Sequence, residues 1–138
     1  MKNILIGVLF MASMFSEPIN EATGWEYDQS TLQAFYMLEV LTVDGEIAEN
    51  EDVVGAFIGG HPDDSASVCV GFINADPNGY TTVPLMGNDG GFPNYMSNGD
   101  IPDQIIFYDS SENSFLDINI NGTNVDFFID LDGDGIDD

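Results

Sequence analysis

Short runs of β-branched and aromatic residues, separated by turn-forming sequences, constrain the fold of this chain more than any other feature. Such runs are typical of strands, and no part of the body has the residue spacing of a convincing amphipathic helix. The predicted strands are 31–43, 53–59, 68–75, 80–86, 104–108, 115–120 and 125–129. We expect an all-β fold, an antiparallel β-sandwich of about seven strands (Ig-like or jelly-roll-like), with a closed barrel as the alternative.

Turn sequences predict how these strands are connected. Asp44-Gly45 is expected to end the first strand, and the turn at 76–79 is expected to join strands 68–75 and 80–86 as a hairpin. Asn121-Gly122 favours a tight type I′ hairpin leading into the last strand. The segment 87–102 is rich in Gly, Asn, Asp and Pro, so we expect a long loop there.

The charge of the chain is strongly one-sided. Its 138 residues include 25 Asp and Glu but 1 Lys or Arg, which gives a formal net charge of -24. Such a surface repels phosphate backbones and anionic membrane faces, so we expect no nucleic-acid partner. Hydrophobic residues still make up 43% of the chain, which is enough for one folded domain rather than a disordered one.

The N-terminal segment, residues 1–24, begins with Lys2 and the apolar run 4–12. This pattern is typical of a secretory signal peptide, and the run is too short for a comfortable membrane span. The alternative is a retained strand. Extended, twelve residues span about 40 Å, long enough to pair along a sheet edge of a neighbouring copy by donor-strand complementation. We expect a secreted, extracellular or cell-surface protein with no membrane span in its mature form.

The C-terminal tail, residues 130–138, has carboxylates at alternate positions and two glycines, like the first half of a calcium-binding loop. The expected calcium ligands are Asp130, Asp132, Asp134, Ile136 through its carbonyl, and Asp138. The bidentate Glu that completes such a loop is not among these residues, so the remaining ligands must come from the body, a neighbour or further sequence. The alternative is a solvated acidic tail.

Several weaker signals lie in the body. The acidic connection 44–52 could hold a second cation, although such a run is usually a solvated loop. Its possible oxygen donors are Glu46, Glu49, Glu51 and Asp52. Two short patterns suggest glycosylation: Asn121 begins an Asn-Gly-Thr sequon, and Ser65 lies in an Asp-Ser-Ala motif in a predicted loop. For Asn121 the alternative is simply a turn residue.

No residue pattern predicts an enzyme. His61 is the single histidine, in a loop sequence without the partners that a general base needs. Cys69 is the single cysteine, so it has no intramolecular disulfide partner, and it lies in an apolar run as a small buried residue would. A reactive thiol needs cationic neighbours, which this chain almost lacks.

Three segments together resemble a recurring β-rich domain of secreted bacterial surface proteins. They are 42–46, 52–58 and 107–112, with Cys69-Val70-Gly71 and Tyr80 between them, and the resemblance covers about residues 31–120. Where that family often has Cys-Arg-Gly, this chain has Val70, so any role of the arginine is absent. The resemblance implies a module that builds surfaces or fibres without catalysis. The Asp-rich tail resembles thrombospondin-type calcium repeats.

Taken together, these patterns divide the chain into the segment 1–24, a β-sandwich 25–129 and the calcium-binding tail 130–138. We expect a non-enzymatic, extracellular, calcium-stabilised structural subunit of a filament or surface assembly. Its partners would be further copies of itself, joined through the N-terminal strand, with possible covalent glycans. The alternative function is a carbohydrate-binding or adhesion module of a larger secreted bacterial protein.

The predicted calcium loop is tested by chelation. Removing Ca²⁺ is expected to lower the melting temperature and loosen any assembly, because the carboxylates would again repel one another. Calorimetric titration with Ca²⁺ would measure binding, with Asp132→Asn as the variant that weakens it and Glu51→Gln as the control. A melting temperature and an assembly unchanged by chelator would contradict the calcium role.

Overall fold

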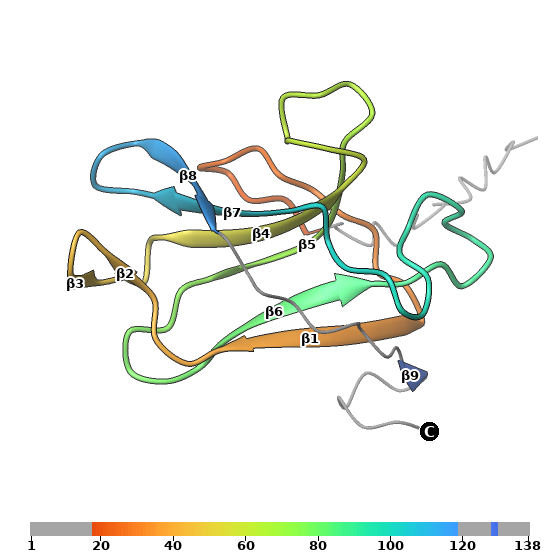
Figure 1. The fold of residues 1–138 in the computed structure, drawn as a ribbon, viewed down its shortest axis with the longest axis horizontal. Helices are drawn as coiled ribbons and strands as arrows, with labels where there is room; N and C mark the ends of the chain where they lie inside the picture. Colours follow the sequence, from red (N-terminus) through yellow and green to blue (C-terminus); the bar gives the residue numbers. More distant parts are fainter. Residues whose placement is uncertain (1–17, 119–127, 130–138) are drawn as a thin grey trace, which may run out of the picture.

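The computed structural model describes residues 18–118 and 128–129, and they form an all-β fold in which the strands pair antiparallel (Figure 1). The larger sheet has the strand order β5-β4-β7-β8, the smaller sheet β6-β1-β9, and β2 and β3 form a separate ribbon. The strands are β1 Leu32–Leu38, β2 Thr42–Val43, β3 Glu46–Ile47, β4 Val53–Ile58, β5 Val68–Asn74, β6 Thr81–Met86, β7 Gln104–Asp109, β8 Ser114–Ile118 and β9 Phe128–Ile129. In this part of the chain no helix is long and apolar enough to cross a membrane.

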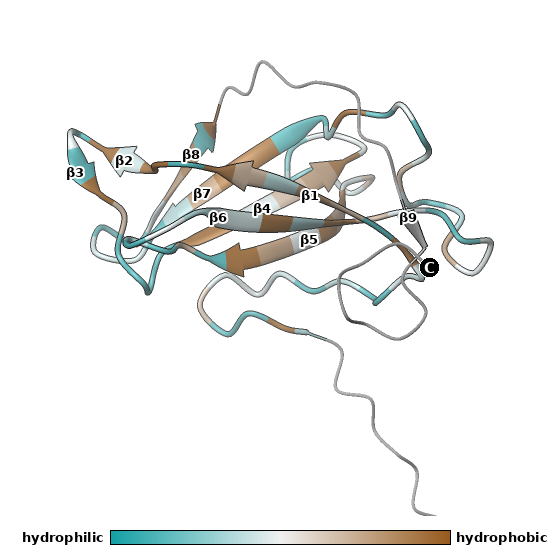
Figure 2. Cartoon of the chain, turned by 90° about the horizontal axis from the view of Figure 1, so that it is seen from below, coloured by the Kyte–Doolittle hydropathy of each residue, from teal (hydrophilic) through white to brown (hydrophobic). Residues whose placement is uncertain are grey.

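The two central strands of the larger sheet, β4 and β7, are buried on both faces. Alternate residues such as Val54 and Phe107 pack with Val83 and Leu85 of the smaller sheet in the main core. The intervening residues, Ile106 among them, pack in a second cluster on the opposite face. Burial on both faces explains why these strands are almost continuously apolar, as the hydropathy colouring of Figure 2 shows. We call the face toward the smaller sheet inner and the other face outer.

The outer face is covered by the segment that precedes β1, and Trp25 is its main contact. The Trp25 ring lies over Gly55 of β4, where an added Cβ would be 2.6 Å from the ring. It meets Phe57 edge-on, with ring centroids 5.1 Å apart. An antiparallel bridge between Ile19 and Glu26 closes this segment on itself. Glycine in the middle of β4 therefore makes room for an indole on the outer face.

The hairpin predicted between strands 68–75 and 80–86 is wrong. The turn at 76–79 is present, but β5 pairs with β4 and β6 pairs with β1, so the chain passes from one sheet to the other. Pro84 gives the physical reason. Its carbonyl points at Gly71, and in an extended strand the N–H lies on the same side as the carbonyl. Proline has no N–H, so β6 lacks a donor toward β5 at this point.

The first predicted strand, 31–43, is divided by the structure into β1 and β2, with residues 39–41 between them. The turn predicted at Asp44-Gly45 is confirmed. It connects β2 and β3 with φ values of 51° and 87° at its two central residues, as a type I′ hairpin requires. The strands predicted at 53–59, 68–75 and 104–108 match β4, β5 and β7 closely, and the predicted long loop lies between β6 and β7.

The hairpin predicted between strands 115–120 and 125–129 is not found in residues 128–129, the described part of its second strand. Phe128 and Ile129 pair with Gln33 and Leu32 of β1, in the smaller sheet, rather than with β8. The turn residues Asn121 and Gly122 lie outside the described residues. Because β8 lies in the larger sheet and β9 in the smaller, the chain changes sheets between them.

The close approach of β5 to β6 predicts that Gly71→Ala is strongly destabilising. An added Cβ would lie against the Pro84 carbonyl, a backbone group that cannot turn away. We expect a loss of about 3 kcal/mol, at the upper end of overpacking costs, measured as a lower urea midpoint with an unchanged m-value. Gly91→Ala is the control, since its Cβ would meet only the Asp89 side chain, at 3.2 Å. Equal midpoints for the two variants would contradict this account of the β5–β6 contact.

Candidate functional site

The residues of three sequence predictions lie outside the described part of the chain. They are the calcium ligands Asp130, Asp132, Asp134, Ile136 and Asp138, the sequon residue Asn121, and the apolar run 4–12. Ser65, the other glycosylation candidate, is described and lies exposed in the β4–β5 loop. Across residues 18–118 and 128–129, no group of three or more His, Cys, Asp or Glu side chains is arranged to hold a metal ion.

The acidic connection 44–52, the second cation candidate, is organised around a buried aspartate. The Oδ2 of Asp52 accepts a hydrogen bond from the Glu49 N–H at 2.7 Å. Its Oδ1 accepts hydrogen bonds from the N–H and the hydroxyl of Ser110, at 2.9 and 2.8 Å. Asp52 is only 4% exposed, so both of its oxygens are occupied by protein donors. By accepting these hydrogen bonds, Asp52 links the β3–β4 connection to the β7–β8 turn.

The same turn contains a second aspartate with a structural role. The Oδ1 of Asp109 accepts hydrogen bonds from the N–H and hydroxyl of Ser111 and from the N–H of Glu112. These bonds, that from the Ser111 hydroxyl first, hold the pKa of Asp109 below its usual value. Asp52 in segment 52–58 and Ser110 in segment 107–112 thus join these two parts of the chain.

An apolar groove lies beside β8, between this strand and residues 40–44. We call it the β8 groove. It has a volume of about 440 Å³ and includes Phe107, Leu116 and Ile118 in its lining. Leu116 and Ile118 pair with Phe107 and Ile105, so they lie on the inner face. Leu116 is nevertheless 40% exposed, and Val40 on the opposite side is 66% exposed. Among the described residues, the inner face is incompletely covered here.

A larger hollow lies on the outer face of the same strand. This Trp25 hollow has a volume of about 600 Å³, with Trp25, Phe57 and Ile106 in its lining and Phe115 contributed by β8. Phe115 is 52% exposed and its ring centroid is 5.7 Å from that of Trp25. Outer-face and inner-face residues alternate along β8. The hollow and the groove therefore lie on opposite sides of one edge strand.

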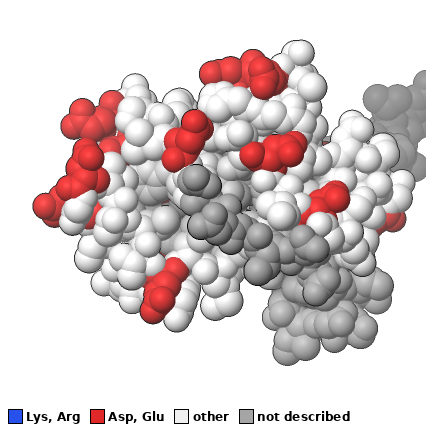
Figure 3. Space-filling model, in the orientation of Figure 1, with Lys and Arg blue, Asp and Glu red and all other residues white. Residues whose placement is uncertain are grey.

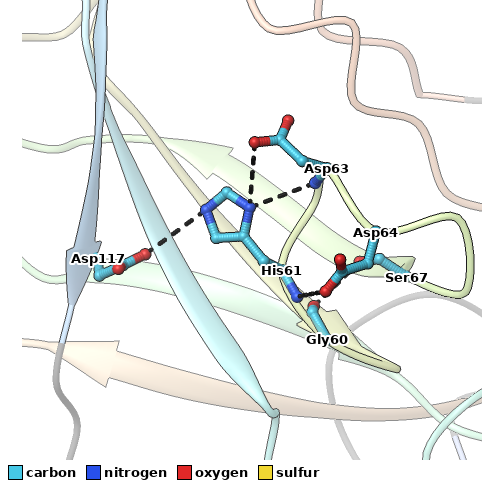
Figure 4. Close-up of polar contacts among 6 residues, drawn as sticks. All are labelled: Gly60, His61, Asp63, Asp64, Ser67 and Asp117. Carbon is cyan, nitrogen blue, oxygen red and sulfur yellow. Dashed lines mark hydrogen bonds and ion pairs between the residues drawn. The ribbon is translucent and has the colours of Figure 1, made fainter.

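His61 connects the β4–β5 loop with β8 at the mouth of the Trp25 hollow (Figure 4). Its Nδ1 accepts a hydrogen bond from the Asp63 N–H at 3.3 Å. The Asp63 carboxylate lies 3.4 Å from the same nitrogen. Nε2 lies 3.8 Å from the Asp117 carboxylate of β8. Asp63 and Asp117 thus hold the imidazole ring between the β4–β5 loop and β8.

Cys69 lines the same hollow, opposite Phe57, at a position set by an irregularity in the β4–β5 pairing. The register shifts between Ala56 and Phe57, so Val70 turns into the main core while Cys69 stays on the outer face. Burial raises the pKa of the Cys69 thiol to about 12. At neutral pH the group is therefore a protonated thiol, which is a poor nucleophile.

Comparisons of the chain with protein-family models, with curated proteins and with solved structures found no match. The functional argument therefore rests on geometry. Sequence reasoning placed Phe115 and Leu116 in a strand but did not identify them as site residues, and it assigned no role to Val40. No local signal distinguishes an exposed apolar strand residue from a buried one, because exposure here depends on where the smaller sheet ends.

The hydrogen bonds of Asp52 predict that Asp52→Ala destabilises the fold. It would leave the partly buried N–H groups of Glu49 and Ser110 without their acceptor, and a donor that loses its partner costs about 1–3 kcal/mol when it is buried. We expect a total loss of about 3 kcal/mol in a urea titration. The neighbouring, exposed Glu51→Ala is the control and should change little. If Asp52→Ala were equally harmless, the carboxylate would not be the acceptor that holds these two loops together.

Proposed function

We propose that this chain is a non-enzymatic, extracellular structural protein, a β-sandwich subunit that assembles into a filament or surface layer through donated strands. The observation that carries the proposal is the β8 groove, an apolar recess beside an edge strand. A β-sandwich is the form we propose for the two sheets, because a single core packs between them. The groove lies where this sandwich is open on one side.

The edge strand β8 lacks the usual protection against pairing. Proteins blunt exposed edges with Lys, Pro, bulges or covering segments. Ser114–Ile118 contains neither Lys nor Pro, and its pairing with β7 is regular. Its one charged residue, Asp117, pairs with Ile106 and so lies on the outer face, away from the groove. Among the described residues, β8 has β7 as its single strand neighbour. Its free edge can therefore accept the backbone of an added strand, and the groove can accept that strand's inward side chains.

The occupant that we propose is the apolar run 4–12 of another copy of the chain. A strand buried on both faces is apolar at consecutive positions, as this run is. Charge also favours it. Residues 1–16 contain Lys2, the single basic residue of the chain, and no Asp or Glu, whereas the described body presents many carboxylates (Figure 3). The segment thus carries a positive charge that the acidic body attracts.

Calcium is proposed to rigidify the subunit or a junction between subunits, through the tail 130–138. The support is chemical: alternating carboxylates are hard oxygen ligands, and a chain of net charge -24 gains stability from a bound divalent cation. A non-enzymatic role is supported by the raised pKa of Cys69, which keeps this thiol protonated and therefore a poor nucleophile.

Electron microscopy and light scattering of two versions of the chain test the assembly. The full chain is expected to form fibres or oligomers, while a chain beginning at Glu17 should stay monomeric and bind a synthetic peptide of residues 1–16. Leu116→Lys should abolish both assembly and peptide binding, because it places a charge in the groove. Ile73→Lys is the matched control, since Ile73 on β5 has the same 40% exposure as Leu116.

Two results would overturn the proposal in different ways. A native protein whose mass shows a start near Glu17 would identify the segment as a cleaved signal peptide and remove the proposed occupant. Assembly by the full chain that Leu116→Lys and Ile73→Lys leave equally intact would remove the β8 groove as the acceptor. Peptide binding by the shortened chain, lost in Leu116→Lys alone, is the outcome that we expect.

A further inference from the structure

A second recess adjoins the Trp25 hollow. This neighbouring hollow, of about 280 Å³, is lined by the loop after β6, including Phe92, Asn94 and Tyr95. The two hollows share Glu26, Val68 and Cys69 in their linings, so they adjoin along the segment before β1. We call the pair the aromatic trough. Its elongated form suits a chain-like ligand better than a compact one.

Aromatic rings lie at both parts of the trough. In the first, Phe115 and Trp25 meet with ring planes tilted by 45°, and Phe115 is more than half exposed. In the second, Phe92 stacks on Tyr95 with centroids 5.1 Å apart and planes inclined by 25°. The Tyr95 hydroxyl accepts the Asp28 N–H at 2.6 Å, which fixes this pair against the segment before β1. Trp25 and Tyr95 are each only 8% exposed, so the rings that a ligand can reach are Phe115 and the half-buried Phe92, whose faces can pack against flat apolar faces of a ligand.

Polar groups along the trough restrict the charge of that ligand. Glu26 and Asp63 contribute carboxylates, Ser67 a hydroxyl and Asn94 an amide, while no Lys or Arg occurs in residues 18–118 or 128–129. A phosphate, sulfate or uronate would meet repulsion without any compensating cation. Anionic ligands are therefore excluded by the chemistry of the lining.

The same carboxylates do not favour a cation strongly. The Asp63 side chain is 92% exposed, and ion pairs at exposed carboxylates are weak and screened by salt. Packing on an aromatic ring is not screened by salt. A neutral ligand with apolar faces and many hydroxyls gains from both the rings and the acceptors. Pyranose rings have that combination.

We propose that the aromatic trough binds a neutral oligosaccharide. The apolar faces of successive sugar rings would pack on Phe115 and on the Phe92–Tyr95 stack, and their hydroxyls would donate to Glu26 and Asp63. The inference goes beyond the proposed assembly and does not depend on it. Phe115 lies on the outer face of β8, whereas the groove for a donated strand is on the inner face. Sugar binding would let an assembled layer hold glycan at many sites at once.

The test uses Trp25, the single tryptophan of the chain, as a fluorescent reporter. The chain would be titrated with neutral hexasaccharides of glucose, xylose, mannose and N-acetylglucosamine, with calorimetry as the second measurement. We expect one of them to bind with an affinity that is the same in low and high salt. Phe115→Ala should weaken binding about tenfold. Asp63→Asn, at a side chain too exposed to affect folding, should weaken it by a smaller factor.

Met37→Ala is the control, because Met37 is 63% exposed on β1 and lines neither hollow; it should leave sugar affinity unchanged. Circular dichroism of Phe115→Ala would verify that the fold is intact. Absence of binding to all four hexasaccharides would overturn the proposal, as would sugar binding that neither Phe115→Ala nor Asp63→Asn weakens. Binding of polylysine alone, lost at high salt, would show general attraction to an acidic surface and would equally overturn it.

Discussion

The structure depends on carboxylates that accept hydrogen bonds from backbone N–H groups, because the chain has almost no basic side chains to pair with them. The sequence has 25 acidic residues and only one Lys or Arg, so ion pairs with lysine or arginine cannot organise the loops. Asp52, Asp89 and Asp109 instead accept N–H groups of the connections around them. For Asp89 the N–H groups of Thr31 and Gly91 lower the pKa to about 2. A depressed pKa stabilises the fold above the ordinary Asp value of about 3.9, and that contribution is lost as the pH falls toward 2.

Loops held in this way fix the positions of both recesses beside β8. The Asp52–Ser110 bonds tie the β7–β8 turn to the start of β4, which places Phe115 and Leu116 at the edge of the larger sheet. The outer face then carries an aromatic covering segment, and the inner face carries the smaller sheet. Within residues 18–118 and 128–129, both layers stop short of β8, so this strand presents apolar side chains in two directions. Assembly and ligand binding could therefore use the same strand without competing for the same face.

Sequence patterns predicted the all-β class, the turn at Asp44-Gly45 and the central strands, because these depend on local chemistry and on continuous apolar runs. They did not predict which strands pair. The hairpin expected across 76–79 is prevented by Pro84, whose effect is visible only once its carbonyl is known to point at Gly71. The candidate site was equally inaccessible. Val40 and Leu116 are ordinary strand-forming residues, and their exposure follows from the ends of β1 and β2. The calcium ligands and the N-terminal strand lie outside the described residues and remain predictions.

The pairing of β1 with β6 has a kinetic consequence. Four strands separate these two in the chain, and Gln33 pairs with Met86. The smaller sheet must therefore close a long loop before its contacts form, whereas β4–β5 and β7–β8 are joined by short connections. The larger sheet also needs a distant pairing, because Val53 of β4 pairs with Tyr108 of β7. We therefore expect the β4–β5 and β7–β8 pairs to form early, with their inner faces uncovered until the distant strands arrive. During synthesis, that interval is when a chain of this topology is most exposed to pairing with the wrong partner.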